Sequence, residues 1–145
     1  MPTDLGTPYS PAWRGRYPHM LRPDYPVWER FLDQYAERIL NLYYDVRVGD
    51  GGVTNGEYDE KMAAMYRAVT AKRLDALVEF QDEVWLVEVA DGPGLRAVGQ
   101  LATYVALYAE DPKIPKPTIP VLVCDSLDRD LKATLRLYSM QFVEV

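Results

Sequence analysis

Two neighbouring apolar segments constrain the fold of this chain more than any other feature of its sequence. They cover residues 74–80 and 84–89, and a short polar stretch that includes Asp82 and Glu83 lies between them. Both segments are rich in valine, leucine and aromatic residues, a composition typical of paired strands. We therefore predict a β-hairpin with a two-residue turn at Asp82 and Glu83.

The predicted register divides this hairpin into two chemically different faces. Leu77 would lie opposite Glu88 and Asp75 opposite Ala90, and opposed residues project to the same side of a sheet. The second face therefore holds Asp75 and Glu88 among apolar residues. A slip of one residue would mix the two sets, so the clean division supports the predicted faces. The first face is entirely apolar: Ala76, Val78, Phe80, Trp85, Val87 and Val89.

Two carboxylates on one half-apolar face need a positive charge between them. Without it, Asp75 and Glu88 repel each other and are costly to remove from water. A hard divalent cation such as Mg²⁺ or Mn²⁺ meets this need with one or two carboxylates and water. The alternative is a structural ion pair or a strand end that reaches solvent. The basic residues available for such a pair are Lys72, Arg73 and Arg96.

The remaining periodicities predict helices and strands that alternate along the chain. A helical apolar stripe covers 27–39, and a further helix is expected over 57–71 with Met62, Met65 and Val69 inward. Other predicted elements are a strand over 42–48, a helix over 95–110, a buried strand over 119–124, a last helix with Ser126 as its N-cap and a strand over 141–145. The pattern predicts a single α/β domain: a mixed central β-sheet flanked by helices on both faces.

Residues 1–26 form a separate kind of segment, before a predicted domain at 27–145. They hold six of the chain's 11 prolines, interleaved with tyrosine and tryptophan. Proline fixes φ and removes an amide donor, so we expect an extended arm. This arm could pack over its own domain, or it could embrace a neighbouring subunit or nucleic acid, and the sequence leaves both open.

Composition excludes several classes of function. The 145 residues suit one domain, and we expect a cytoplasmic protein because no signal peptide or membrane-length apolar run is evident. A lone Cys124 excludes a cysteine zinc cluster, and a lone His19 leaves nucleophilic triads without a good base. The net charge of −6 argues against a broad basic surface for tight duplex DNA binding.

The acidic hairpin and the segment after it resemble the PD-(D/E)XK nuclease superfamily. In that family an aspartate on one strand precedes an apolar strand that ends in Glu-x-Lys, and a helix follows. Asp75 and Glu88 match these acids, and Gln100 and Tyr104 resemble the Gln-x-x-x-Tyr motif of the RecB-type branch. The resemblance covers about residues 27–125 and implies a restriction-endonuclease-like fold. It also implies Mg²⁺ or Mn²⁺ held by Asp75, Glu88 and the Val89 carbonyl.

The resemblance carries further implications for the site. Family members often supply an acidic residue from the first core helix, for which Glu29 and Glu37 are candidates. Gln100 and Tyr104 would position the substrate or a metal-bound water.

The chain departs from the family pattern at Ala90, where the family has its catalytic lysine. That lysine orients or helps to deprotonate the attacking water, and losing such a group typically costs about 10²–10⁴ in rate. Three explanations stay open. A relocated Lys72, Arg73 or Arg96 could replace the lysine, the site could have decayed naturally, or the alanine could be an engineered substitution.

Two functions follow as expectations. The first is a metal-dependent phosphodiesterase that acts on DNA, with activity absent or strongly reduced because of Ala90. The second is a non-enzymatic descendant, for example a phage or viral particle component, in a host cell or virion, that forms a ring or dimer through the arm of residues 1–26. The acidic composition favours the second function, whereas the set of Asp75, Glu88, Gln100 and Tyr104 favours the first.

Overall fold

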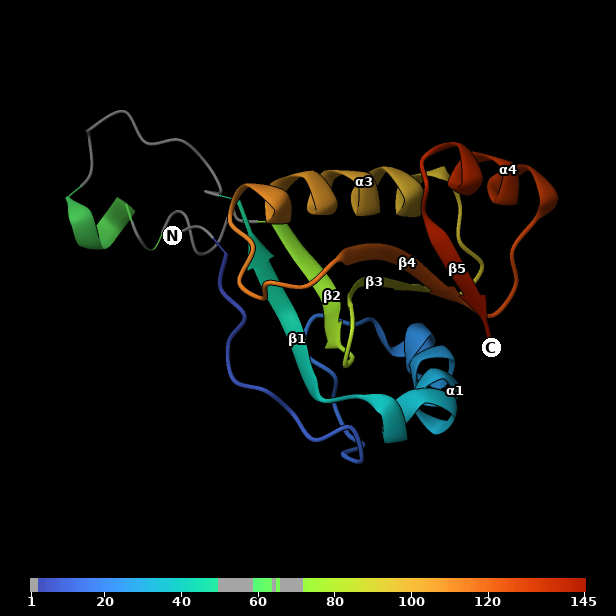
Figure 1. Cartoon of the computed structure of the whole chain (residues 1–145), viewed down its shortest axis with the longest axis horizontal. Helices are drawn as coiled ribbons and strands as arrows, with labels where there is room; N and C mark the ends of the chain where they lie inside the picture. The colour runs from blue at the N-terminus through green and yellow to red at the C-terminus, as the bar shows by residue number, and fades with distance from the viewer. Residues whose placement is uncertain (1–2, 50–58, 64, 66–71) are drawn as a thin grey trace.

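A computed structural model describes residues 3–49, 59–63, 65 and 72–145 as a three-layer α/β fold. A central sheet separates α1 (Tyr25–Tyr35) from α3 (Leu95–Glu110) and α4 (Arg129–Leu137). In Figure 1, α3 and α4 lie above the sheet and α1 lies below it. The predicted mixed sheet with helices on both faces is therefore present. No helix among these residues is long and apolar enough to cross a bilayer.

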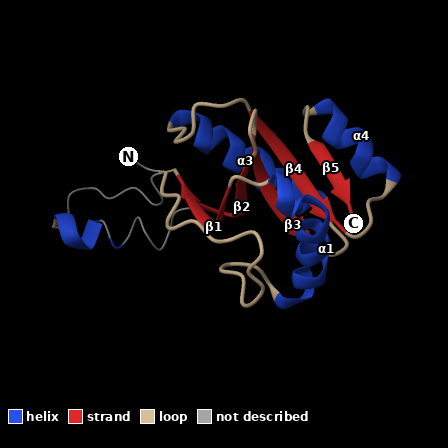
Figure 2. Cartoon of the chain, turned by 60° about the horizontal axis from the view of Figure 1, so that its bottom comes forward, coloured by secondary structure: helices blue, strands red, loops and turns tan. Residues whose placement is uncertain are grey.

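The sheet has five strands in the order in which they occur along the chain. The first three are antiparallel neighbours, whereas β3, β4 and β5 run parallel to one another (Figure 2). Parallel neighbours need crossover connections, which α3 and α4 supply. The strands are β1 (Asn41–Val48), β2 (Lys72–Glu79), β3 (Val84–Ala90), β4 (Thr118–Cys124) and β5 (Gln141–Glu144).

The hairpin formed by β2 and β3 has the predicted faces but a different register. Leu77 lies opposite Leu86, and the Phe80 amide donates to the Glu83 carbonyl at 2.9 Å. The two-residue turn is therefore Gln81–Asp82, one residue earlier than predicted. This displaces the pairing by two residues, and because side chains alternate with period two every residue keeps its face. Continued by one pair past Ala76–Val87, the register sets Asp75 opposite Glu88.

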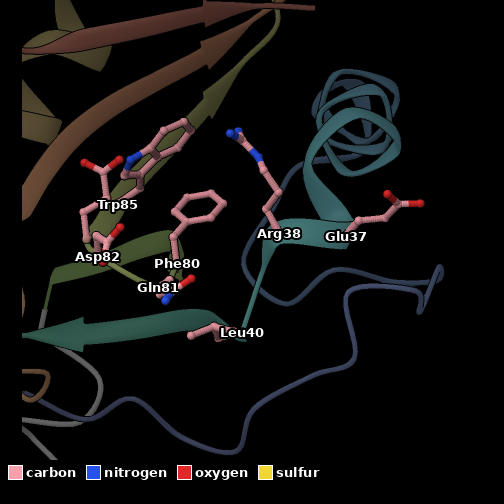
Figure 3. Close-up of a pocket in the computed structure, with 8 residues that line it drawn as sticks. Glu37, Arg38, Leu40, Phe80, Gln81, Asp82 and Trp85 are labelled. Carbon is pink, nitrogen blue, oxygen red and sulfur yellow. The ribbon is translucent and has the colours of Figure 1, made fainter.

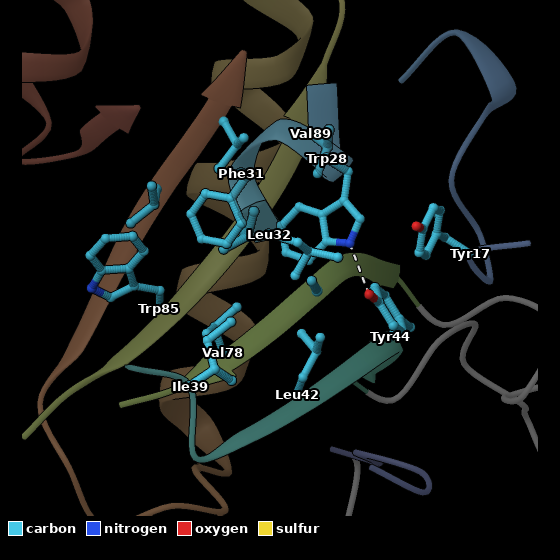
Figure 4. Close-up of a cluster of buried hydrophobic side chains, with 14 of the residues drawn as sticks. Tyr17, Trp28, Phe31, Leu32, Ile39, Leu42, Tyr44, Val78, Trp85 and Val89 are labelled. Carbon is cyan, nitrogen blue, oxygen red and sulfur yellow. Dashed lines mark hydrogen bonds between the residues drawn. The ribbon is translucent and has the colours of Figure 1, made fainter. Parts of the chain in front are cut away.

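The apolar face of the hairpin packs against α1. All six residues predicted for it belong to one buried cluster, together with Trp28, Phe31 and Leu32 of the helix (Figure 4). We call this cluster the α1-side core. The Trp28 indole of this cluster has a partner, because its Nε1 donates to the Tyr44 hydroxyl at 2.8 Å. The helix therefore covers the hairpin with a core that leaves no place for a charge.

The opposite face packs against α3 and α4. Tyr104 and Tyr108 of α3 lie over β1, β2 and β3, and Leu131 and Leu135 of α4 complete a cluster over β4. We call these two clusters the α3-side core. The Asp128 side chain caps α4 by accepting from the Leu131 amide at 2.8 Å, so the predicted cap at Ser126 is wrong by two residues.

The arm lies along its own sheet edge. Asp4 pairs with Arg47 and Tyr9 with Leu42, so the arm adds two bridges to the outer side of β1. Tyr17 of the arm is buried in the α1-side core, and short 3-10 turns flank α1 at Arg22–Asp24 and Ala36–Arg38. Of the two arrangements left open by the sequence, packing on its own domain is the one that these residues adopt.

One predicted helix is only partly covered by the described residues. Residues 60–63 and 65 are helical, whereas Val69 and most of 50–71 lie outside the described part. Met62 is 50% exposed and Met65 is 61% exposed, so the prediction that they point inward is wrong. The helical spacing of these methionines therefore does not reflect burial.

Candidate functional site

The hairpin ladder ends beside Asp75 because the apolar pattern of β1 and β2 changes face there. Asp45 of β1 has φ of +51°. Before it, Leu42 and Tyr44 belong to the α1-side core, whereas Val46 and Val48 after it belong to the α3-side core. In β2, Leu74 lies in the α3-side core and Ala76 in the α1-side core. Asp45 and Asp75 each lie between two neighbours that face opposite cores, so the strict alternation of the strand is broken at both aspartates.

Side chains take over the hydrogen bonds where the backbone ladder stops. The last backbone pair of β2 and β3 is Ala76 with Val87. Beyond it, the Val89 amide donates to Asp75 Oδ2 at 2.9 Å, and the Asp75 amide donates to Glu88 Oε1 at 3.3 Å. The structure therefore brings Asp75 and Glu88 together, and each carboxyl accepts a hydrogen bond from a backbone amide of the other strand.

The carboxyl pair is buried without a cation. Asp75 is 7% exposed and Glu88 is 8% exposed, and no lysine or arginine of the described residues forms a salt bridge with either one. Burial raises the pKa of Asp75 to about 7. Burial, with the negative charge of Asp75 second, raises the pKa of Glu88 to about 9. At neutral pH the pair retains protons unless a cation replaces them.

The pair supplies two carboxyl groups and no complete set of metal ligands within the described residues. One oxygen of each carboxyl, Asp75 Oδ1 and Glu88 Oε2, has no hydrogen-bond partner among the described residues. No group of three or more acidic, histidine or cysteine side chains in those residues is arranged to hold a metal ion. A cation here would have two carboxylate ligands, and Mg²⁺ commonly completes such a set with water and a backbone carbonyl.

A third acid approaches the pair from an unexpected position. Asp24, directly before α1, accepts a hydrogen bond from the Asp91 amide at 3.0 Å, and its charge helps to raise the pKa values of Asp75 and Glu88. Its own pKa is raised, mainly by burial. An aspartate just before a helix normally indicates a cap, so this placement of Asp24 is not predicted from the sequence.

The two acids suggested for this role lie elsewhere. Glu29 accepts a hydrogen bond from the Tyr17 hydroxyl at 2.7 Å. Glu37 lies beside the turn end of the hairpin, in a pocket with Phe80 (Figure 3), while Asp75 lies toward the other end. Neither Glu29 nor Glu37 has a contact with the pair, so this expectation is wrong.

The two motif residues on α3 differ in their relation to the pair. Tyr104 is buried in the α3-side core, and its pKa is raised first by burial and then by the charges of Glu88 and Asp75. Gln100 lies one turn earlier on α3 and is half-buried. Its side-chain amide makes no hydrogen bond within the described residues. Tyr104 is therefore electrostatically coupled to the carboxyls, and Gln100 has an amide available for a ligand.

Within the described residues, none of the three basic residues suggested as replacements for the family's lysine forms a salt bridge with Asp75 or Glu88. Ala90 ends β3 and packs against the α3-side core. Lys72 is exposed, Arg73 pairs with Asp45 at 3.0 Å, and the charge of Arg96 acts on Tyr104. Two of the three candidates therefore act on a residue that is coupled to the pair: Arg96 acts on Tyr104, and Arg73 is paired with Asp45, whose charge raises the pKa of Asp75.

Comparisons of this chain with protein-family models, with curated proteins and with solved structures gave no match.

Proposed function

We propose that Asp75 and Glu88 bind a divalent cation, Mg²⁺ or Mn²⁺, in a PD-(D/E)XK-type nuclease core. One observation carries the proposal: two buried carboxyls meet where a hairpin ladder stops, and no lysine or arginine within the described residues forms a salt bridge with them. A divalent ion would remove the repulsion and the protons together. The corresponding function is a metal-dependent DNA phosphodiesterase that is inactive or strongly impaired as written.

The order of elements supports a restriction-endonuclease-like fold. Asp75 lies on the middle strand of an antiparallel group, Glu88 lies near the end of the next strand, and α3 then leads to the parallel strand β4. This is the arrangement that the sequence resemblance implies. The mixed sheet is compatible with many functions, so the assignment depends on the acids and not on the fold.

Each residue of the site has a distinct role in this proposal. Asp75, Glu88 and the Val89 carbonyl would hold the ion, which supplies charge stabilisation to a phosphoryl group when it is bound. Gln100 would orient water or a phosphate oxygen through its half-buried amide. The Tyr104 hydroxyl would orient the Glu88 carboxyl, because the charge of Glu88 already raises the pKa of Tyr104.

Ala90 is the reason for the expected lack of cleavage. An alanine has no group that can orient a water or offset charge at a phosphorane-like transition state. Because Ala90 is half-buried at the strand end, a lysine at this position could extend its stem along the α3-side core and keep its ammonium group at the site.

The test restores the missing group. The variant Ala90→Lys is assayed with Mn²⁺ on linear duplex and single-stranded DNA, and we expect cleavage to rise by about 10²–10⁴ over the starting chain. Ala90→Met, of similar length without charge, serves as the matched control and should stay inactive. The double variant Ala90→Lys with Asp75→Asn should also be inactive. A folded Ala90→Lys variant without metal-dependent cleavage contradicts the proposal.

A second candidate function has one observation in its favour. Ala90 is packed against apolar side chains, so the site as written is consistent with a nuclease-fold protein that binds or assembles without cleavage. A homo-oligomeric phage or viral particle component is the form that we propose for it. Light scattering after gel filtration, together with no cleavage by either the starting chain or Ala90→Lys, would favour this candidate over the enzyme.

A further inference from the structure

Two exposed leucine–arginine pairs lie on opposite sides of the sheet near the end of β3. Leu21 and Arg22 stand directly before α1, and Leu95 and Arg96 begin α3. Leu21 is 71% exposed and Leu95 is 74% exposed, and both arginines are exposed. Because α1 and α3 cover opposite faces of the sheet (Figure 1), the two pairs flank the carboxyl pair from its two sides.

The first pair is held beside the site by Asp24. Arg22 begins the 3-10 turn that ends at Asp24, and the Asp24 carboxylate accepts from the Asp91 amide at 3.0 Å. Asp91 directly follows β3, three residues after Glu88. After burial, the charge of Asp24 also helps to raise the pKa values of both carboxyls of the pair. The turn that carries Leu21 and Arg22 is therefore fixed at the site.

The second pair continues the helix face that meets the carboxyls. Arg96, Gln100 and Tyr104 recur every four residues along α3, so they lie along one face of the helix. Tyr104 is buried, Gln100 is half-buried and Arg96 is exposed. Burial and then the charge of Glu88 raise the pKa of Tyr104. This face therefore leads from the carboxyl pair outward to Arg96 at the surface.

Neither arginine is engaged within the described part of the chain. Arg22 and Arg96 form no salt bridge or side-chain hydrogen bond there. Arg14, Arg47 and Arg73 differ, because each of them pairs with an aspartate. An unpaired guanidinium presents donors in a fork that matches phosphate oxygens. The two arginines are therefore available to an anionic partner.

The charges around the site restrict that partner. Asp91 and Asp125 share a side-chain hydrogen bond that raises the pKa of Asp91, while the charge of Arg30 lowers it. With a net charge of −6, the chain lacks the broad basic surface that a duplex needs. A single strand needs few phosphate contacts, and its unstacked bases are open to apolar side chains such as Leu21 and Leu95.

We propose that a single-stranded polynucleotide crosses the carboxyl pair, with one phosphate on Arg22 and another on Arg96. Leu21 and Leu95 would contact the sugars and bases beside these phosphates. The inference rests on the proposed function, because it names the substrate of the same site. It adds contacts from residues that are not ligands of the ion.

Fluorescence anisotropy with a short labelled oligonucleotide tests the proposal, in EDTA and in Mg²⁺. We expect the starting chain to bind the single strand more tightly in Mg²⁺, because the ion removes negative charge at the site, and to bind the matching duplex more weakly. Arg22→Gln and Arg96→Gln should each weaken binding about fivefold near 0.1 M salt, and each should lower the salt slope by about 0.7, the value for one phosphate contact on a single strand.

Arg136→Gln is the matched control. Arg136 is an exposed arginine near the end of α4 that also forms no salt bridge within the described residues, so its variant should bind as the starting chain does. An equal loss in Arg136→Gln, equal affinity for duplex and single strand, or no binding of the single strand in either buffer overturns the inference.

A titration with Mn²⁺ alone separates this inference from the proposed function. Arg22→Gln and Arg96→Gln should bind the ion as the starting chain does, because neither arginine is a ligand. Unchanged ion binding with unchanged oligonucleotide affinity in both variants overturns the strand path only. Absence of ion binding in the starting chain overturns the proposed function instead.

Discussion

The acids at the two ends of the β2–β3 hairpin have opposite environments. Glu79, at the turn end, accepts from the Lys116 ammonium at 2.7 Å and from the Asn41 amide at 2.8 Å, and these bonds lower its pKa. Neither Asp75 nor Glu88 forms a salt bridge with a lysine or arginine of the described residues, and burial raises both of their pKa values. Within that part of the chain, the fold therefore neutralises the acid at the turn end and leaves the pair at the other end without a cation.

This difference raises the question of how the charge of Asp75 and Glu88 is compensated. An uncompensated pair of buried carboxyls opposes folding, because the folded chain must either keep the protons or bear the charge repulsion. Glu79 gains a lysine from the loop before β4, whereas the pair lies beside the acids Asp24 and Asp45, whose charges raise the pKa of Asp75 further. We propose that an external cation compensates this charge.

The largest expected effect concerns pH. The unfolded pKa of these carboxyls is about 4, whereas the folded values are about 7 and about 9. The folded state thus binds more protons, and the free energy of unfolding should fall as pH rises from about 4 through both folded values, by about 1.4 kcal/mol per pH unit for each carboxyl that keeps its proton only in the folded state. Urea unfolding at pH 6 and pH 10 without divalent ions measures this loss.

Two additions to the pH experiment separate the pair from the rest of the chain. Millimolar Mn²⁺ should restore stability at high pH, because the ion binds only the folded pair. The double variant Asp75→Asn with Glu88→Gln should flatten the decline. A decline of equal size in that variant would assign the pH dependence to other groups.

A second prediction sets single substitutions at the two ends against each other. Glu79→Gln should destabilise the chain by about 1–2 kcal/mol at pH 8, because it removes a charge-assisted bond to Lys116. Glu88→Gln should be nearly neutral at pH 6 and stabilising at pH 10, where it removes a buried charge. Denaturant midpoints for both variants provide the measurement, and effects of the same sign at pH 10 would remove the contrast between the two ends.

The smallest effect is expected at Tyr104. Tyr104→Phe removes only the hydroxyl beside the pair, so stability should change by less than about 1 kcal/mol and Mn²⁺ affinity by less than about tenfold. Gln100→Ala should leave stability unchanged, because its amide has no partner within the described residues. Calorimetric titration of both variants gives the affinities, and a complete loss of binding in either would make that residue a direct ligand.

The faces of the hairpin could be predicted because they depend only on the alternation of residues within its two strands. The faces of β2 and β3 follow from alternation alone, which tolerates an error of two residues in the register. The turn position does not follow from it, since Gln81–Asp82 and Asp82–Glu83 are both polar pairs. The actual turn is the one that sets Asp75 opposite Glu88.

The surroundings of the pair could not be read from local pattern. Asp24 and Asp45 reach it from the end of the arm and from an edge strand, and the positive φ of Asp45 has no signature that distinguishes it from an ordinary strand residue. The partner of Glu79 likewise comes from a loop 37 residues further along the chain. Contacts of this kind are set by tertiary packing, which a single sequence does not encode in any one segment.

Calorimetric titration with Mn²⁺ in the starting chain tests the central claim most directly. We predict a single binding site in the starting chain and in the control Glu79→Gln, and no binding in Asp75→Asn. Each variant's cooperative unfolding shows that it is folded. Binding of equal strength in Asp75→Asn, or no heat of binding in the folded starting chain at millimolar Mn²⁺, contradicts the claim that the hairpin's unpaired acids form a cation site.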